Sequence, residues 1–140
     1  MIDHAERAVL NAQAPFVSSV DNWESLAAWS DHIVQLKETH GRELGCPLGK
    51  LAAELVATDE AARVQLDDAL QTWEGRLRAG VDRMQERRLI EPGADIDVLA
   101  TATMASLQGG LLLAKTSHST RPLRIALAHL RTHATTRHEV

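Results

Sequence analysis

The residue of this chain with the most reactive side chain is its single cysteine, Cys46. It stands just before Pro47, which suits the first position of a helix, and a helix N-terminus favours a thiolate. This placement suggests a redox or electrophile sensor, whereas an inert thiol in a packed turn is the simpler interpretation. A nucleophile formed by Cys46 with His32 or His40 would lack an orienting third residue. One cysteine also excludes an intrachain disulfide, which is typical of the reducing cytoplasm.

A second pattern with chemical potential is the pair His129 and His133, spaced four residues apart. On a helix this spacing puts both imidazoles on one face, as two metal ligands require. No cysteine or acid lies nearby at ligand spacing, and seven histidines in 140 residues make chance pairs common. We therefore expect solvated histidines, with no metal and no other cofactor.

Three arginines, Arg83, Arg87 and Arg88, form a basic spot that is either a solvated helix face or a phosphate contact. The formal net charge is −4, and an acidic chain is poorly suited to neutralising phosphates broadly. The sequence contains no Gly-rich phosphate loop, no His-Glu-x-x-His and no Gly-x-Ser-x-Gly. We expect neither an enzyme nor nucleic-acid binding through these residues.

The elements that position these residues are all helices, because apolar residues recur at spacings of three and four along the whole chain. Asp21 and Glu24 predict a capping box at the second helix. Gly80, inside the longest helix, indicates a bend or a close contact. The six expected helices cover about residues 5–16, 21–40, 47–57, 60–89, 95–117 and 120–134. The sequence therefore predicts one all-α domain over residues 1–140.

The fifth expected helix is apolar on every side, since no residue from Val98 to Ala114 is charged. One side must pack on the chain's own core, and a partner subunit is the simplest cover for the other. The run is too short, and too rich in Thr, Gln and Gly, to indicate a membrane span. Gly109 and Gly110 indicate close helix approach, either across a dimer seam or within one chain. With no secretory signal at the N-terminus, we expect a cytoplasmic protein.

Two segments resemble a known family: Gly-Cys-Pro-Leu-Gly-Lys-Leu-Ala-Ala-Glu-Leu (45–55) and Leu-Gln-Gly-Gly-Leu-Leu-Leu-Ala-Lys (107–115). Both are similar to the C-terminal ligand-binding and dimerisation domain of TetR-type transcriptional repressors, in a branch with a Gly-Cys-Pro-Leu-Gly turn. The resemblance covers nearly the whole chain. Such repressors carry an N-terminal helix-turn-helix, whereas Met1 stands about where the ligand domain would begin. We expect the sensing half without the DNA-reading half.

The resemblance implies a homodimer through the last two helices and a pocket for a small, mainly apolar effector among the middle ones. Filling the pocket would tilt the first helix. The expected interface residues are Leu107, Gly110, Leu111, Ala114, Leu123, Ala126, Leu127 and Leu130. The expected pocket residues are Trp29, Ile33, Cys46, Leu51, Trp73, Leu77 and Met104, for which ordinary core filling is the alternative.

Two other functions stay open at the level of sequence. The chain could be a stand-alone dimeric ligand-binding or interaction module that associates with intact repressors. It could instead be a small redox-active protein that depends on Cys46.

Overall fold

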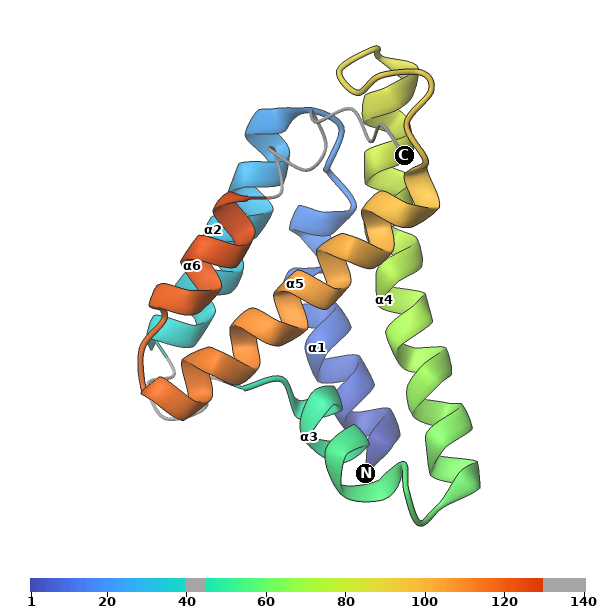
Figure 1. Ribbon diagram of the computed structural model, residues 1–140, viewed down its shortest axis with the longest axis vertical. Helices are drawn as coiled ribbons and strands as arrows, with labels where there is room; N and C mark the ends of the chain where they lie inside the picture. The colour runs from blue at the N-terminus through green and yellow to red at the C-terminus, as the bar shows by residue number, and fades with distance from the viewer. Residues whose placement is uncertain (40–44, 130–140) are drawn as a thin grey trace.

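Six α-helices and no strand make up the computed structural model, which describes residues 1–39 and 45–129 (Figure 1). The helices are α1 (Ile2–Val17), α2 (Trp23–Thr39), α3 (Pro47–Leu55), α4 (Glu60–Glu86), α5 (Ile96–Ser117) and α6 (Arg121–Ala128). The predicted all-α architecture is confirmed. The end of the predicted last helix lies outside the described residues.

Two aspartates begin the longest helices by accepting hydrogen bonds from backbone N–H groups that have no partner within the helix. The Asp59 carboxylate accepts from the Ala62 N–H at 3.0 Å. The Asp95 carboxylate accepts from the Val98 N–H at 3.2 Å. Such caps contribute about 1 kcal/mol each, so the start of α4 and of α5 is fixed locally.

The cap of α2 lies one residue later than the sequence predicts. The Asn22 Oδ1 accepts from the Ser25 N–H at 2.7 Å, and the Ser25 Oγ accepts from the Asn22 N–H at 3.1 Å. This reciprocal pair is the capping box, so the predicted pair Asp21 and Glu24 is wrong. Asparagine is as strong a cap as aspartate, and serine can return the second hydrogen bond.

Helix α1 lies in the middle of the bundle, where it packs against α2, α3 and α4. Helix α5 crosses in front of it in Figure 1 and packs against α4 and α6, and α6 also contacts α2. The largest fully buried side chains come from all six helices and the α1–α2 corner. They are Trp29, Leu48, Leu66, Leu77, Met84, Leu107, Leu123, Val17 and Val20.

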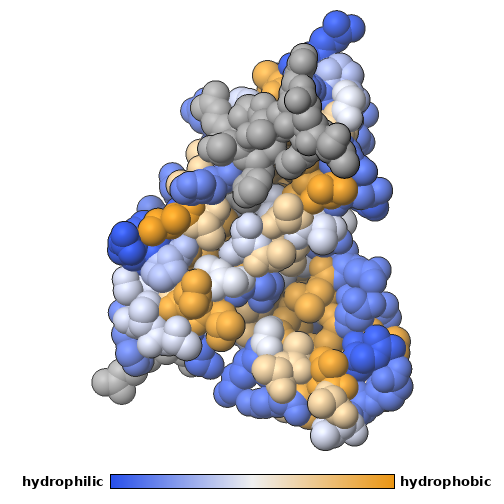
Figure 2. Space-filling view, in the orientation of Figure 1, coloured by the Kyte–Doolittle hydropathy of each residue, from blue (hydrophilic) through white to orange (hydrophobic). Residues whose placement is uncertain are grey.

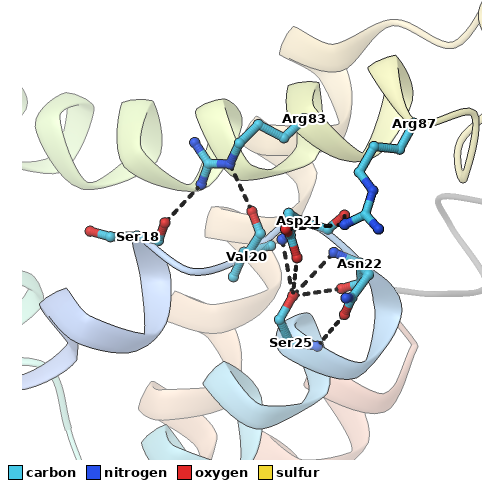
Figure 3. A network of polar contacts seen from close by, with 7 residues as sticks. All are labelled: Ser18, Val20, Asp21, Asn22, Ser25, Arg83 and Arg87. Carbon is cyan, nitrogen blue, oxygen red and sulfur yellow. Dashed lines mark hydrogen bonds and ion pairs between the residues drawn. The ribbon is translucent and has the colours of Figure 1, made fainter.

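The corner between α1 and α2 is held tightly against α4. Val20 is fully buried, and a Cβ added to Gly80 would lie 2.9 Å from the Val20 Cβ. Arg83 donates through Nε to the Val20 carbonyl at 3.0 Å and through a terminal nitrogen to the Ser18 carbonyl at 3.2 Å (Figure 3). Gly80 therefore marks the close contact that its position in a helix suggests.

Arg87 adds an ion pair to the same corner. One of its terminal nitrogens lies 3.0 Å from the Asp21 carboxylate and donates to the Asp21 carbonyl at 3.2 Å (Figure 3). Two of the three arginines of the basic spot, Arg83 and Arg87, therefore hold one corner of the fold.

Helix α5 is 22 residues long, and by length and composition alone it could cross a membrane. The expectation that the apolar run is too short for a span is therefore wrong. One such helix is weak support for a membrane protein, since the core helix of a soluble protein passes the same test. Leu107 and Ala114 of α5 are fully buried within the bundle. One side of α5 therefore packs as a core helix does, although only 39% of its most apolar window is buried.

Candidate functional site

The best candidate for a ligand site is a cavity of about 140 Å³ among α1, α2, the start of α3, α4 and α5. We call it the central cavity. Its lining is mostly apolar, and it comprises Ala8, Val9, Ala12, Gln13, Ile33, Leu36, Lys37, Cys46, Pro47, Trp73 and Leu111. Ala8 and Ala12 are exposed, so the cavity reaches solvent past α1. Small concave apolar sites with a few polar groups are typical of ligand binding.

A buried glutamine joins three helices beside this cavity. The Gln13 side chain is 3% exposed, and its Oε1 accepts from Trp29 Nε1 at 2.9 Å and from Trp73 Nε1 at 2.8 Å. Its Nε2 donates to the Val9 carbonyl at 3.2 Å. An indole N–H can only donate, so the amide oxygen must face both tryptophans. Helix α1 is thereby hydrogen-bonded to α2 and α4 through one side chain.

A second contact ties α1 to α2 near the mouth. His32 places its Nε2 2.7 Å from the Ala12 carbonyl, and its ring stacks on Phe16 with centroids 4.1 Å apart. His32 therefore holds α1 against α2, and nothing in the structure pairs it with Cys46. His40, the other histidine considered for a nucleophile, lies outside the described residues.

The far wall of the cavity contains Cys46 and Lys37. Cys46 is buried, and its Sγ lies 3.7 Å from the Gln108 Nε2. The Lys37 ammonium donates to the Gly45 carbonyl at 3.0 Å. A buried thiol is usually inert, so this surrounding gives the redox interpretation of Cys46 no support.

Three predicted pocket residues, Ile33, Cys46 and Trp73, line the central cavity. Trp29 is fully buried and does not line the cavity itself, but it donates a hydrogen bond to Gln13, which does. The sequence analysis missed Gln13, although a polar residue on the apolar stripe of the first helix was a usable signal. Whether any of these residues binds an effector stays a prediction.

The other three predicted pocket residues lie elsewhere. Leu51 and Leu77 are buried in the core and do not line the central cavity. Met104 lines a different hollow, an open groove between α4 and α5. Their apolar spacing predicted burial, which holds for all three, but burial alone does not place a residue at one particular cavity.

The predicted interface residues face the inside of the subunit. Those described as buried are Leu107, Gly110, Leu111 and Ala114 of α5, with Leu123 and Leu127 of α6. Ala126 is half-buried, and Leu130 lies outside the described residues. A Cβ on Gly110 would lie 3.1 Å from the Leu123 Cα and 3.2 Å from the Ala126 Cβ. Close packing of α5 on α6 within one chain therefore accounts for Gly110.

The opposite side of α5, which we call the outer side, is apolar and uncovered. Val98, Leu112 and Leu113 are 52%, 61% and 57% exposed. A Cβ on Gly109 would meet nothing within 4 Å. In Figure 2 the colours along the visible part of α5 run from white to orange, and blue residues lie at the margins. Large apolar side chains exposed along one side of a helix, with no charged residue between them, make this side a candidate interaction surface.

Other features offer weaker sites. The groove between α2 and α6, of about 520 Å³, includes Asp31, Glu38 and Arg124, and an Arg124–Glu38 ion pair at 2.8 Å spans it. Such a charged, open groove holds an apolar molecule poorly. Of the two histidines considered as metal ligands, His129 places its Nδ1 2.9 Å from the Ile125 carbonyl, and His133 lies outside the described residues.

Comparison with known proteins places this arrangement in a family. A family model described as "Tetracyclin repressor-like, C-terminal domain" matches residues 23–130. No curated protein and no solved structure gives a significant match. The match covers most of the chain and includes α2 to α6. The chain therefore belongs to the family of tetracyclin repressor-like (TetR-like) C-terminal domains.

Proposed function

We propose that this chain is the effector-sensing and dimerisation domain of a cytoplasmic TetR-type transcription regulator. A small apolar effector occupies the central cavity, and a second copy covers the outer side of α5. The domain has no catalytic role, binds no nucleic acid itself and does not span a membrane. The observation that carries the proposal is that α1 forms one wall of the cavity and bonds through Gln13 to two of the helices around it.

The two ends of α1 are held very differently, so α1 can act as a lever that pivots at its C-terminal end. Its C-terminal end continues into the corner that Gly80 and Arg83 hold against α4. Near its N-terminal end, the described side chains form one hydrogen bond to another helix. Gln65 Nε2 of α4 donates to Asp3 Oδ1 at 2.7 Å, and this bond is exposed. A molecule that enlarges the cavity therefore moves the N-terminal end most.

This movement gives a mechanism for regulation. In a TetR-type regulator the DNA-reading head precedes this domain, so a tilt of α1 changes the spacing of two heads in a dimer. Half-site spacing on DNA is geometric, and a small change weakens binding. The effector acts only insofar as it binds the tilted conformation more tightly than the untilted one.

The outer side of α5 supports the choice of a second copy as the partner. Its exposed residues Val98, Leu112 and Leu113 are apolar, and a two-fold axis lets the same surface cover itself. Gly109 lets the two helix backbones approach closely, because no side chain of its own subunit fills that space.

Distances between spin labels test the lever directly. The label is placed on exposed α1 through Arg7→Cys, with Cys46→Ser to remove the native thiol, and the distance between copies is measured by double electron–electron resonance. Toluene is the probe ligand. We expect the distance to shift on adding toluene, whereas a control label at Gln71→Cys on α4 stays in place. If toluene binds and neither label moves, the proposed lever is wrong.

A cavity-blocking pair tests whether the central cavity is the binding site. Ala8→Phe fills the mouth, whereas Asn11→Phe adds the same ring at an exposed α1 position that does not line the cavity. Isothermal titration calorimetry with toluene should show binding only for the Asn11 variant. Equal affinities would place the ligand elsewhere.

A further inference from the structure

The hydrogen-bonding capacity of Gln13 limits what the central cavity can accept. The amide oxygen already accepts from the two tryptophans, and one N–H donates to the Val9 carbonyl. A glutamine amide carries two N–H groups, so one donor remains. Among the described residues the structure provides no acceptor for it. Gln13 lines the cavity, so its remaining N–H belongs to the few polar groups of the lining, beside the Lys37 ammonium and the Cys46 thiol.

The rest of the lining disfavours a positive charge on the ligand. Lys37 is the one charged lining residue among those described, and its ammonium, which donates to the Gly45 carbonyl, repels a cation. No described carboxylate lines the cavity to balance an amine. Val9, Ile33 and Leu111 form apolar walls, where an unpaired charge is costly to bury.

The size of the cavity sets the size of the ligand. Its volume is about 140 Å³. An apolar cavity of about 150 Å³ in another protein holds one benzene molecule. A single six-membered ring with a short substituent therefore matches the space.

From these three limits we infer that the ligand is a molecule of single-ring size that carries no positive charge and has one hydrogen-bond acceptor, which the Gln13 amide N–H recognises. The inference rests on the proposed function of the central cavity and adds the chemistry of the ligand. An acceptor on Gln13 contacts the one side chain that joins α1 to α2 and α4. The recognising residue is therefore also the residue that holds the lever.

Matched probes of nearly equal size test the inference. Toluene has no acceptor, benzaldehyde has one on an uncharged ring, and benzylamine is a cation at neutral pH. By calorimetry we expect benzaldehyde to bind about fivefold more tightly than toluene, which is the usual gain from one hydrogen bond. Benzylamine should bind more weakly than either. Equal affinities for toluene and benzaldehyde, or a preference for benzylamine, would overturn the inference.

The variant Gln13→Glu separates the two roles of the side chain. Burial raises the pKa of a carboxyl group at this position, so the side chain is protonated: one oxygen accepts from both tryptophans, the single O–H donates to the Val9 carbonyl, and no donor remains for the ligand. Toluene should still bind, which shows that the cavity has formed, and the preference for benzaldehyde should disappear. A preference that survives in this variant would assign the recognition to another group.

Nuclear magnetic resonance gives a readout on the unmodified chain, in case the variant fails to fold. Benzaldehyde should shift one of the two side-chain amide proton resonances of Gln13 more than toluene does. Both probes should shift Ile33 and Leu111. If benzaldehyde binds without the Gln13 shift, the inference about Gln13 is wrong, whereas the central cavity remains the binding site. If neither probe perturbs Ile33 and Leu111, the proposed site itself is wrong.

Discussion

Gly109 and Gly110 are neighbours in α5, yet their surroundings are opposite. A Cβ on Gly110 would press on α6 of the same chain, whereas one on Gly109 would meet nothing. The leucines that follow repeat the contrast, since Leu111 is 2% exposed and Leu112 is 61% exposed. The fold of one chain therefore explains the inner side of α5 and leaves the outer side without a cover.

The largest expected effect comes from placing a charge on each side of α5. Leu111→Arg buries an unpaired charge and should lower the free energy of unfolding by about 3 to 5 kcal/mol. Leu112→Arg puts the same group in water and should change the stability of the monomer little. Urea unfolding followed by circular dichroism, on samples dilute enough to be monomeric, measures both. Equal losses of stability in the two variants would contradict the assignment of Leu111 to the inner side and Leu112 to the outer side of α5.

Two glutamines, one buried and one exposed, allow the same comparison for hydrogen bonds in the bundle interior and at the surface. Gln13→Leu leaves two buried indole N–H groups without an acceptor and should cost about 2 to 4 kcal/mol. Gln71, whose Nε2 donates to Asp67 Oδ2 at 2.8 Å, is exposed, so Gln71→Leu should cost less than about 1 kcal/mol. The same unfolding experiment compares them. A similar cost at both positions would show that the Gln13 network contributes nothing beyond an exposed hydrogen bond.

The two glycines give a smaller and sharper test. Gly110→Val overpacks the contact with Leu123 and Ala126 and should cost about 1 to 3 kcal/mol. Gly109→Val meets open space, so the monomer should keep or slightly gain stability from the better helix propensity of valine. In a dimer the same change should weaken association. A Gly109 variant that destabilises the monomer would contradict the assignment of this residue to the outer side.

The smallest effect is expected at the edge of α5, where an ion pair joins it to α4. Arg78 donates to Asp97 at 2.7 Å, and this contact raises the pKa of Arg78. Both side chains are exposed, so Arg78→Ala should change the free energy of unfolding very little. The effect should shrink further in 1 M salt. A large, salt-independent loss would mean that more than this surface ion pair holds the edge of α5.

The sequence predicts the helices well because local signals define them. Periodic apolar residues, Pro47 and the aspartates before α4 and α5 all act within a few residues of one another. The capping box at α2 was misplaced by one residue, since Asp21 and Asn22 are both good caps and only the backbone decides between them.

The two sides of α5 could not be assigned from the sequence, and the reason is physical. A helix with a polar face reveals its orientation, because the polar face must meet water. From Val98 to Ala114 there is no charge on any side, so the sequence does not show which side of the helix faces water. The sequence analysis therefore chose as interface residues the leucines that the subunit buries itself.

The central cavity was predictable only in part. Ile33 and Trp73 follow the apolar stripes that mark buried positions. Gln13 depends on two tryptophans, one of them 60 residues away, and no local pattern reports such a contact. Counting apolar residues also overlooks a polar residue whose partners are themselves buried.

Sedimentation equilibrium of the wild-type chain beside Leu112→Arg, at micromolar concentration, tests most directly whether a second copy covers the outer side of α5. We predict that the wild type sediments as a dimer and that the variant, with an unchanged circular dichroism spectrum, sediments as a monomer. A monomeric wild type, or a variant that dimerises as tightly as the wild type, would contradict this account.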